Sequence, residues 1–264
     1  MWSTLTRFAI VLTSVVLNVS QLNYSNSNFN ILSRIVGGKP ITINESPWQG
    51  ALLFGDHFFC GGTIISKNWI LTAAHCIFAD VAFTVRVGSK YYQKNGQIRK
   101  VKRVILNSRY NSKTMEHDIA LILIESAFKF NTDVKPIRLA KFKRNLPQKF
   151  VVSGWGLINE TLTSPACSLK AATIFPVTQS NCEKNYKKGS ITKNMICAAA
   201  PKKDACTGDS GGPLFFEGIQ YGIVSFGVGC GREMYPGVYT DVRRKNTWIK
   251  KVILKYGGSM PIFE

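Results

Sequence analysis

The stretch Gly208-Asp209-Ser210-Gly211-Gly212-Pro213 decides the fold of this chain when it is taken together with two distant segments. These segments are Ala73-Ala74-His75-Cys76 and Asp118-Ile119-Ala120-Leu121. A serine hydroxyl is a weak nucleophile at neutral pH and needs an imidazole to take its proton, while a carboxylate orients that imidazole and stabilises its cation. The three segments together supply such a serine, histidine and aspartate.

Each motif also has a purely structural explanation when it stands alone. The Gly-rich run around Ser210 is typical of a tight turn, His75 beside a cysteine is typical of a packed core residue, and Asp118 could end or cap a strand. The other histidines, His57 and His117, have no comparable setting. If all three explanations were right, the three residues would stand in the order histidine, aspartate, serine only by coincidence. This order along the chain distinguishes one lineage of serine hydrolases from the others. We therefore interpret the three residues as base, orienting carboxylate and nucleophile.

These segments resemble those of trypsin-like proteases of the chymotrypsin family, and the resemblance runs from Ile35 to about Tyr256. It implies an all-β fold of two packed six-stranded antiparallel β-barrels with a C-terminal helix and an active site between the barrels. It places the N-terminal barrel in residues 35–148 and the C-terminal barrel with the helix in residues 149–264, joined by the basic linker 140–148. The overall pattern is similar to invertebrate digestive trypsins, including the mite group 3 allergens.

Short apolar runs between turn residues also predict antiparallel strands rather than a parallel sheet. The runs lie at Gln49–Phe54, Thr63–Ser66, Phe83–Val87, Ile119–Ile124, Phe150–Val152, Ile219–Phe226 and Val238–Val242. Near the end of the chain, apolar residues recur at helical spacing and lysines lie away from them. This stripe, which predicts a terminal helix packed on the body, consists of Ile249, Val252, Ile253 and Tyr256.

The first 20 residues have the pattern of a signal peptide. Residues 1–7 carry one positive charge and no acidic residue, and residues 8–19 are almost entirely apolar. This run is shorter than the ~20 residues of a membrane span, and no later segment is long enough and free of charge. A buried N-terminal helix is the alternative, but the Asn- and Ser-rich segment that follows offers it no partner. We therefore expect a secreted, extracellular protein without a membrane anchor.

Residues 21–34 are predicted to be an activation propeptide that ends at the bond between Arg34 and Ile35. The resemblance implies that cutting this bond frees an α-amino group, which turns inward and pairs with Asp209. A buried carboxylate needs such a partner, and the pair would fix the backbone on either side of it. The N–H groups of Gly208 and Ser210 would then form an oxyanion hole. The alternative is that Arg34 is not an activation site and is an incidental basic residue in a loop.

Seven cysteines behind a signal peptide predict disulfides formed in an oxidising compartment, although the sequence alone does not fix their pairing. The resemblance implies three pairs, namely Cys60 with Cys76, Cys182 with Cys197, and Cys206 with Cys230. Cys167 is left over. We expect a buried, inert thiol there, and the alternative is an exposed thiol that could link two molecules.

Substrate preference is predicted from a few positions that resemble the trypsin branch. Asp204 lies six residues before Ser210, where that branch has an acidic residue at the base of its pocket, and Gly227 and Gly237 match residues that leave the pocket open. A carboxylate in a narrow pocket favours an Arg or Lys side chain of the substrate. Ala205, where many trypsins have Ser, favours Arg over Lys. The alternative is an exposed acid that balances the two preceding lysines.

The chain departs from the family pattern at Phe226, where the family usually has Trp. This residue stands between Ser225, which would support the triad, and Gly227, which would pair with the substrate backbone, so weaker binding is a plausible consequence. Residues 88–97 contain none of the glutamates that calcium-binding relatives have there. We therefore expect no calcium, and no metal or cofactor at all.

The formal net charge of +19 favours a solvated cationic surface. The functional alternative is attraction to polyanions such as sulfated glycans. Nucleic acid is not expected as a partner of a secreted chain whose basic runs lack interleaved aromatic residues. The basic runs lie at 99–103, 141–144, 187–188 and 243–255, and glycosylation motifs start at Asn44 and Asn159, with Pro47 weakening the first.

These observations together predict a secreted zymogen of a serine endopeptidase. It would cleave after Arg or Lys through an acyl-enzyme, act as a monomer, and have peptide substrates and protein protease inhibitors as partners. One alternative is an inactive homologue that binds a partner without cleaving it, which Phe226 and the unpaired cysteine leave open. The other is a polyanion-binding protein without enzymatic activity.

Overall fold

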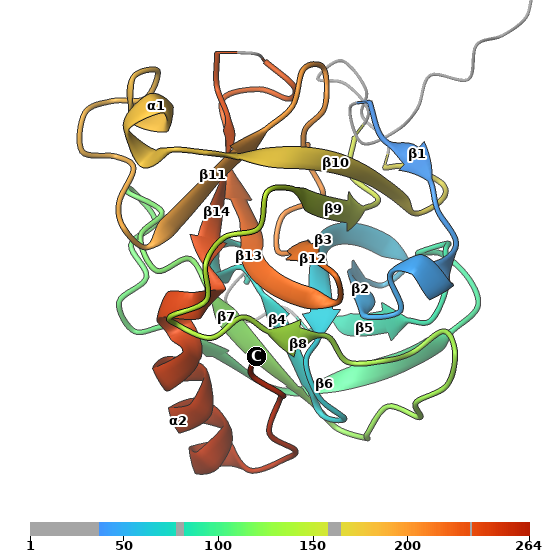
Figure 1. The fold of residues 1–264 in the computed structure, drawn as a ribbon. Coiled ribbons are helices and arrows are strands. Elements are labelled where there is room, and N and C mark those ends of the chain that lie inside the picture. Colours follow the sequence, from blue (N-terminus) through green and yellow to red (C-terminus); the bar gives the residue numbers. More distant parts are fainter. Residues whose placement is uncertain (1–36, 78–81, 158–164, 233) are drawn as a thin grey trace, which may run out of the picture. The chain divides into compact units, whose positions relative to one another are not determined.

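The computed structural model describes residues 37–77, 82–157, 165–232 and 234–264 (Figure 1). The predicted signal peptide and propeptide, with Arg34 and Ile35, lie outside these ranges, as does Asn159. The described residues belong to one compact unit. None of the helices in the described ranges is long and apolar enough to cross a membrane.

The first barrel is closed by six antiparallel strands in the order β2-β3-β4-β7-β6-β5. Its strands are β2 Gln49–Phe54, β3 His57–Ile64, β4 Trp69–Thr72, β5 Thr84–Val87, β6 Gln97–Leu106 and β7 Ala120–Ile124. All five residues of β7 are buried, because one face points into the barrel and the other is covered by the rest of the protein.

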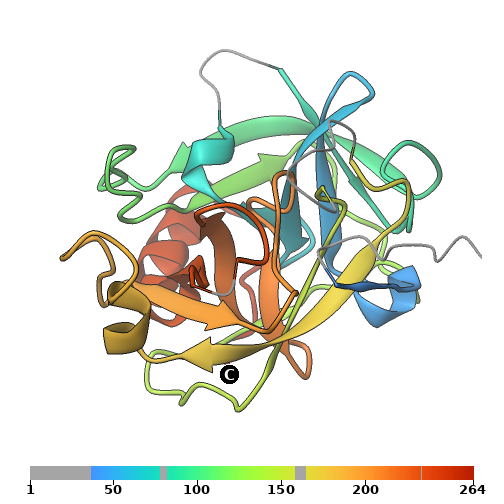
Figure 2. The same ribbon diagram turned by 90° about the horizontal axis from the view of Figure 1, so that it is seen from above.

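The second barrel contains β9 Phe150–Gly154, β10 Lys170–Val177, β11 Met195–Ala199, β12 Pro213–Phe216, β13 Ile219–Phe226 and β14 Gly237–Asp241. Its order is β10-β11-β14-β13-β12-β9, and pairing of β9 with β10 closes it. Two short strands extend this sheet: β1 Lys39–Pro40 pairs with β10, and β8 Arg138–Leu139 runs parallel to β13. Figures 1 and 2 show the two barrels side by side. The predicted fold class is therefore confirmed.

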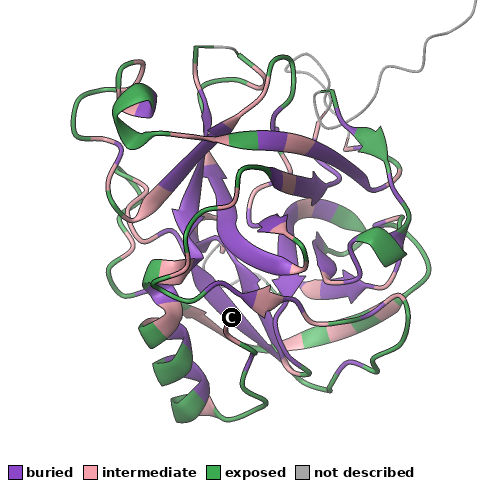
Figure 3. Ribbon diagram, in the orientation of Figure 1, coloured by how far each residue is buried: buried purple, intermediate pink, exposed green. Residues whose placement is uncertain are grey.

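The helices are few and lie at the periphery of the barrels. They are α1 Gln179–Glu183, α2 Asn246–Tyr256 and the short 3₁₀ helices Ile43–Glu45, Ala74–Cys76 and Val242–Lys245. Helix α2 buries Ile249, Val252 and Ile253 in the core of the first barrel and half-buries Tyr256, so the predicted apolar stripe faces inward. Its outer face is exposed (Figure 3).

The first part of the segment between the barrels, residues 140–144, is fastened to the second barrel and to the C-terminal residue. The backbone N–H of Ala140 donates to the carbonyl of Gln220. Arg144 donates from Nε to the hydroxyl of Tyr221 at 2.7 Å, while its carbonyl accepts from Arg243 Nη1 at 2.6 Å. Glu264 adds hydrogen bonds to Leu139 and Lys141 and an ion pair with Arg138.

Candidate active site

The predicted base and its orienting carboxylate both come from the first barrel. His75 lies in the 3₁₀ helix that follows β4, and Asp118 lies two residues before β7. Because β4 and β7 are neighbours in register, with Thr72 opposite Ala120, their adjoining ends bring the two side chains together. His75 Nδ1 is 2.7 Å from Asp118 Oδ2, and the backbone N–H of His75 donates to Oδ1 at 2.9 Å.

Two residues of the second barrel complete the surroundings of Asp118, which is fully buried. The hydroxyl of Ser225 donates to Oδ2 at 2.5 Å, and that of Thr240 donates to the backbone carbonyl of Asp118 at 2.8 Å. The carboxylate requires a proton on Nδ1 of His75 and so leaves Nε2 as the basic nitrogen. The resemblance had suggested Ser225 for this support. Thr240 was missed, because a threonine in a strand carries no signal in the sequence.

Ser210 lies on the loop before β12, and this loop packs directly on the segment that leads to His75. The backbone N–H of Gly61 donates to the Ser210 carbonyl at 2.8 Å. A Cβ on Gly211, whose φ is +78°, would lie 2.2 Å from Thr72 Oγ1 and 3.2 Å from the nitrogen of Ala73. Only glycine permits this approach, which brings the serine loop of one barrel against the histidine segment of the other.

The backbone around Ser210 also offers hydrogen-bond donors. The N–H groups of Gly208 and Ser210 donate to no residue in the described ranges, whereas the next two, on Gly211 and Gly212, are bonded to the carbonyls of Val224 and Asp209. Gly208 has a φ of +97°, a conformation that side chains rarely adopt. Two unengaged donors next to a nucleophile can stabilise an oxyanion.

Asp209 is buried under this loop in a close-fitting cavity. Its carboxylate accepts from the N–H groups of Gly156 at 2.8 Å and Cys206 at 3.0 Å. A Cβ on Gly154 or Gly156 would lie 2.1 Å or 2.4 Å from a carboxylate oxygen, so neither position has room for a side chain. Burial raises the pKa of Asp209 to about 6. Ile35, its predicted partner, lies outside the described residues.

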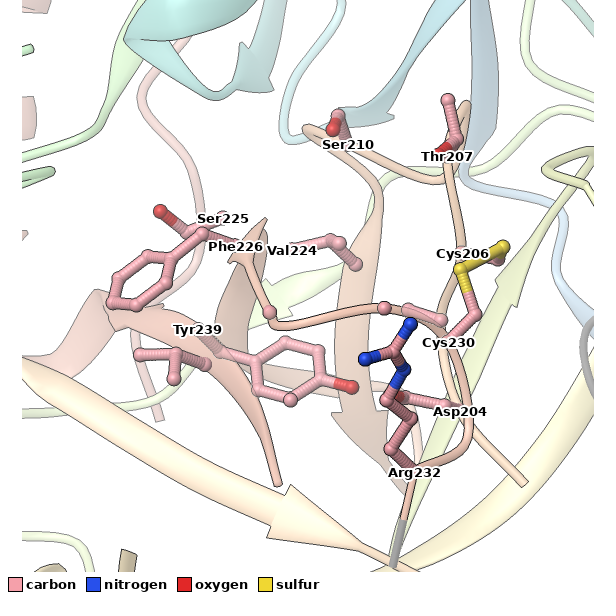
Figure 4. Close-up of a pocket in the computed structure, with 15 residues that line it drawn as sticks. Asp204, Cys206, Thr207, Ser210, Val224, Ser225, Phe226, Cys230, Arg232 and Tyr239 are labelled. Atoms are coloured by element: carbon pink, nitrogen blue, oxygen red, sulfur yellow. A yellow bond between two sulfur atoms is a disulfide. The ribbon is translucent and has the colours of Figure 1, made fainter. Parts of the chain in front are cut away.

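A cavity of about 430 Å³ extends from Ser210 to Asp204 (Figure 4). Asp204 is only 5% exposed and accepts a hydrogen bond from the N–H of Gly231 at 3.1 Å, while its Oδ1 has no partner among the described residues. Burial raises the pKa of Asp204 to about 7. The structure therefore places Asp204 in a cavity rather than on the exposed surface.

The walls of this cavity contain the other predicted pocket residues. These are Ala205, Ser225, Phe226, Gly227 and Gly237. The ring of Phe226 packs edge-on against Tyr186, with centroids 6.0 Å apart, and so retains an aromatic wall. The sequence analysis missed Arg232, which also lines the cavity (Figure 4). It lies outside the motifs that the resemblance uses.

Three disulfides join the cysteine pairs that the resemblance implied: Cys60 with Cys76, Cys182 with Cys197, and Cys206 with Cys230. The first anchors the His75 segment to β3, and the third links two walls of the cavity. The sulfur atoms of Cys60 and Cys76 lie near His75, but their disulfide bond removes them as metal ligands. Disulfides of this kind are typical of extracellular proteins.

The expectation of a buried Cys167 was wrong, because the structure exposes this residue. Cys167 lies between β9 and β10, where the neighbouring Ala166 and Leu169 are buried. These two side chains occupy the apolar positions of the segment and leave the thiol facing solvent. The alternative of an exposed thiol therefore holds.

Comparisons with known proteins agree with this architecture. The solved structure "Neuropsin, a serine protease expressed in the limbic system of mouse brain" superimposes with a TM-score of 0.77 at 36% identity, covering 82% of this chain and 98% of that one. Trypsin alpha of Drosophila melanogaster is 42% identical over 82% of this chain and 86% of its own. Hypodermin-A of Hypoderma lineatum is 41% identical over 79% and 83%. A family model described as Trypsin matches residues 35–249. The chain belongs to the trypsin family of serine endopeptidases.

Proposed function

We propose that this protein is a secreted endopeptidase, made as a zymogen, that cleaves peptide bonds after Arg or Lys. One observation carries the proposal: a buried carboxylate oxygen of Asp204 without a described partner lies in the same cavity as Ser210. Leaving such an atom unpaired costs about 1–3 kcal/mol or more, and a guanidinium or ammonium group of a substrate would remove that cost. With its basic side chain in the cavity, the substrate would have the rest of its chain, outside the cavity, at the hydroxyl of Ser210.

The proposed mechanism uses the groups around Ser210. Its hydroxyl oxygen attacks the peptide carbonyl while Nε2 of His75 takes the proton, and Asp118 stabilises the resulting imidazolium. The N–H groups of Gly208 and Ser210 receive the negative charge of the tetrahedral intermediate. The C–N bond then breaks as His75 returns the proton to the leaving amine. Water, activated by the same imidazole, hydrolyses the acyl-enzyme and restores the serine.

Activation is assigned to the buried carboxylate of Asp209. The α-amino group of Ile35, freed by a cut after Arg34, would compensate the charge of this carboxylate and fix the loop from Gly208 to Ser210. The domain boundaries remain those predicted: signal peptide 1–20, propeptide 21–34, first barrel 35–148 and second barrel with helix 149–264. The disulfides support secretion.

The test is an assay of the activated protein on short peptide substrates that differ only in the residue before the cut. We expect cleavage after Arg and Lys, with Arg preferred because Ala205 offers no hydroxyl to an ammonium group. Cleavage after Phe or Leu should be much slower. A correctly folded, activated protein that cleaves none of the substrates would favour the non-cleaving homologue, and a preference for apolar residues would contradict the assignment of Asp204.

A further inference from the structure

Lys245 is a buried cation outside the machinery described above. It ends the 3₁₀ helix Val242–Lys245, immediately before α2, and is only 2% exposed. Its ammonium group is 2.9 Å from His117 Nδ1 and donates to Asn194 Oδ1, also at 2.9 Å. A buried charge is costly unless its hydrogen bonds are satisfied, so the lysine depends on this arrangement. The arrangement joins the two barrels, since His117 belongs to the first and Asn194 to the second.

His117 directly precedes Asp118 in the chain and has a backbone conformation that needs support. Its φ is +54°, in the left-handed region that residues other than glycine seldom adopt. Its carbonyl accepts a hydrogen bond from the N–H of Ile119 at 2.8 Å, which forms a tight turn around Asp118. A sparsely populated conformation persists only when its surroundings hold it. The contact with Lys245 supplies such a constraint one residue from the carboxylate.

Other polar contacts connect the residues before Asp118 to the segment around Asn194 and fix that segment within the second barrel. Glu116 accepts a hydrogen bond from the hydroxyl of Thr192 at 2.7 Å and another from the side-chain amide of Asn194. The carbonyl of Asn194 accepts from the N–H of Asp241 at 2.8 Å. The residues next to Asp118 are therefore bound to two separate segments of the second barrel, the barrel that carries Ser210.

We propose that Lys245 is a positioning residue, which holds Asp118 in place through His117 and so aligns His75 of the first barrel with Ser210 of the second. The proposal rests on the proposed function, because it concerns the same three catalytic groups. Lys245 does not touch them and acts through the backbone that carries Asp118. An error of about 1 Å in such alignment can cost about 100-fold in rate.

The charges around the contact are consistent with this role. Burial, followed by the nearby charge of Lys245, lowers the pKa of His117, against the opposing effect of Glu116. Nδ1 of His117 accepts the hydrogen bond, because an ammonium group can only donate. Burial lowers the pKa of Lys245 to about 8, against the opposing effects of Glu116 and Asp241. The remaining cations that act on the contact are Arg109, on the first barrel, and Arg244, beside Lys245.

The experiment compares Lys245→Met with Lys250→Met in protein that is produced as the full chain and then activated. Methionine keeps the apolar stem of Lys245 and removes its donors, whereas Lys250 is an exposed residue of α2 and serves as the matched control. We expect Lys245→Met to lower kcat on an Arg substrate by about 10- to 100-fold, with KM changed less than threefold. Lys250→Met should leave both constants unchanged. If Lys245→Met does not fold, His117→Asn replaces it, because Asn tolerates the left-handed backbone but is too short to keep the contact.

An Asp118→Asn background separates positioning from a general loss of structure. If Lys245 acts through the carboxylate of Asp118, the same substitution should cost less than about threefold in kcat in this background. An equal loss in both backgrounds, or a kcat within twofold of the unmodified protein for a folded variant, would overturn the proposal. The proposed function is tested separately, since it fails if Asp118→Asn alone retains full activity.

Discussion

Asp204 Oδ1 and the hydroxyl of Tyr239 are two buried oxygen atoms that face the same backbone position, Gly237, and neither has a hydrogen-bond partner among the described residues. A Cβ added to Gly237 would lie 2.8 Å from the first atom and 3.0 Å from the second. The glycine therefore leaves open the space through which both oxygens can be reached. Under the proposed function, this arrangement would make the pocket selective by charge and by size.

The charge of the pocket is tested by Asp204→Ser. Removing the carboxylate leaves the buried cation of an Arg or Lys substrate uncompensated, at a cost of roughly 3–5 kcal/mol, or about 10²–10⁴ in kcat/KM. Cleavage after Phe or Leu should scarcely change, because these side chains gain nothing from the carboxylate. Equal losses on both kinds of substrate would indicate a folding defect, and no loss on Arg substrates would remove Asp204 from substrate recognition.

The pH dependence of selectivity follows from the pKa of Asp204, which burial raises to about 7. Because the folded value exceeds that of the unfolded chain, protonation of this group contributes stability that is fully present below the unfolded pKa and is lost as the pH rises through about 7. An Arg substrate binds the ionised form. The ratio of kcat/KM for Arg and Leu substrates should therefore fall as the pH drops from 8 to 6. A constant ratio would contradict this assignment. Any effect of pH that is common to both substrates cancels when the ratio is taken.

Activation is tested by Arg34→Gln, with Lys39→Gln as the control. The uncut precursor should be nearly inactive, because no α-amino group reaches Asp209. After a cut, the paired α-amino group should have a pKa above the ~7.7–8.0 of a free terminus, so its contribution is lost as the pH rises through the folded value. Rates measured before and after proteolytic activation check this. Full activity of the uncut variant would exclude a zymogen.

The catalytic residues should behave as one unit. Ser210→Ala and His75→Ala should each lower kcat by about 10⁵–10⁶, and the double substitution should cost little more, because each alone disables the same proton transfer. KM should change much less. If purified Ser210→Ala protein, shown to be free of contaminating protease, still cleaved peptide substrates, this result would contradict the mechanism.

The exposed thiol of Cys167 gives a simple test of the structure. Cys167→Ser should leave kcat/KM and thermal stability unchanged, because the side chain contributes nothing to the core. In the unmodified protein the thiol should react with a thiol reagent under native conditions, as exposed cysteines do. Failure to react before unfolding would restore the expectation of a buried residue.

Much of the fold could be predicted because apolar runs mark strands that are covered on both faces. The prediction for residues 219–226 agrees with β13, and the run at 119–124 differs from β7 by one residue. Strands β4, β6, β10, β11 and β12 were not among the predicted runs. Strand β6 was missed because several of its residues are basic and exposed and its regularity comes from pairing with β5 and β7. Strand β3 was predicted only in its last part, because Cys60, Gly61 and Gly62 hide its pattern.

The candidate site was predictable only where the chemistry requires a particular residue type in a motif. Ser210, His75 and Asp118 carry such motifs, and Asp204 has a fixed distance from one of them. No motif marks the remaining residues, which are Thr240, Arg232 and Lys245. Their positions near the site depend on which strands and loops meet in three dimensions. The exposure of Cys167 depended in the same way on which neighbours fill the core.

The fastening of the segment between the barrels, through Ala140, Arg144 and Glu264, has a consequence for how a substrate is received. Domains that close around a ligand need a pliable hinge, and part of the binding energy is then consumed by the movement. Here the connecting segment is bonded to Gln220, Tyr221 and Arg243 of the second barrel, so no hinge is available at that point. Bending of the connecting segment at these residues should therefore consume little of the binding energy of a peptide substrate.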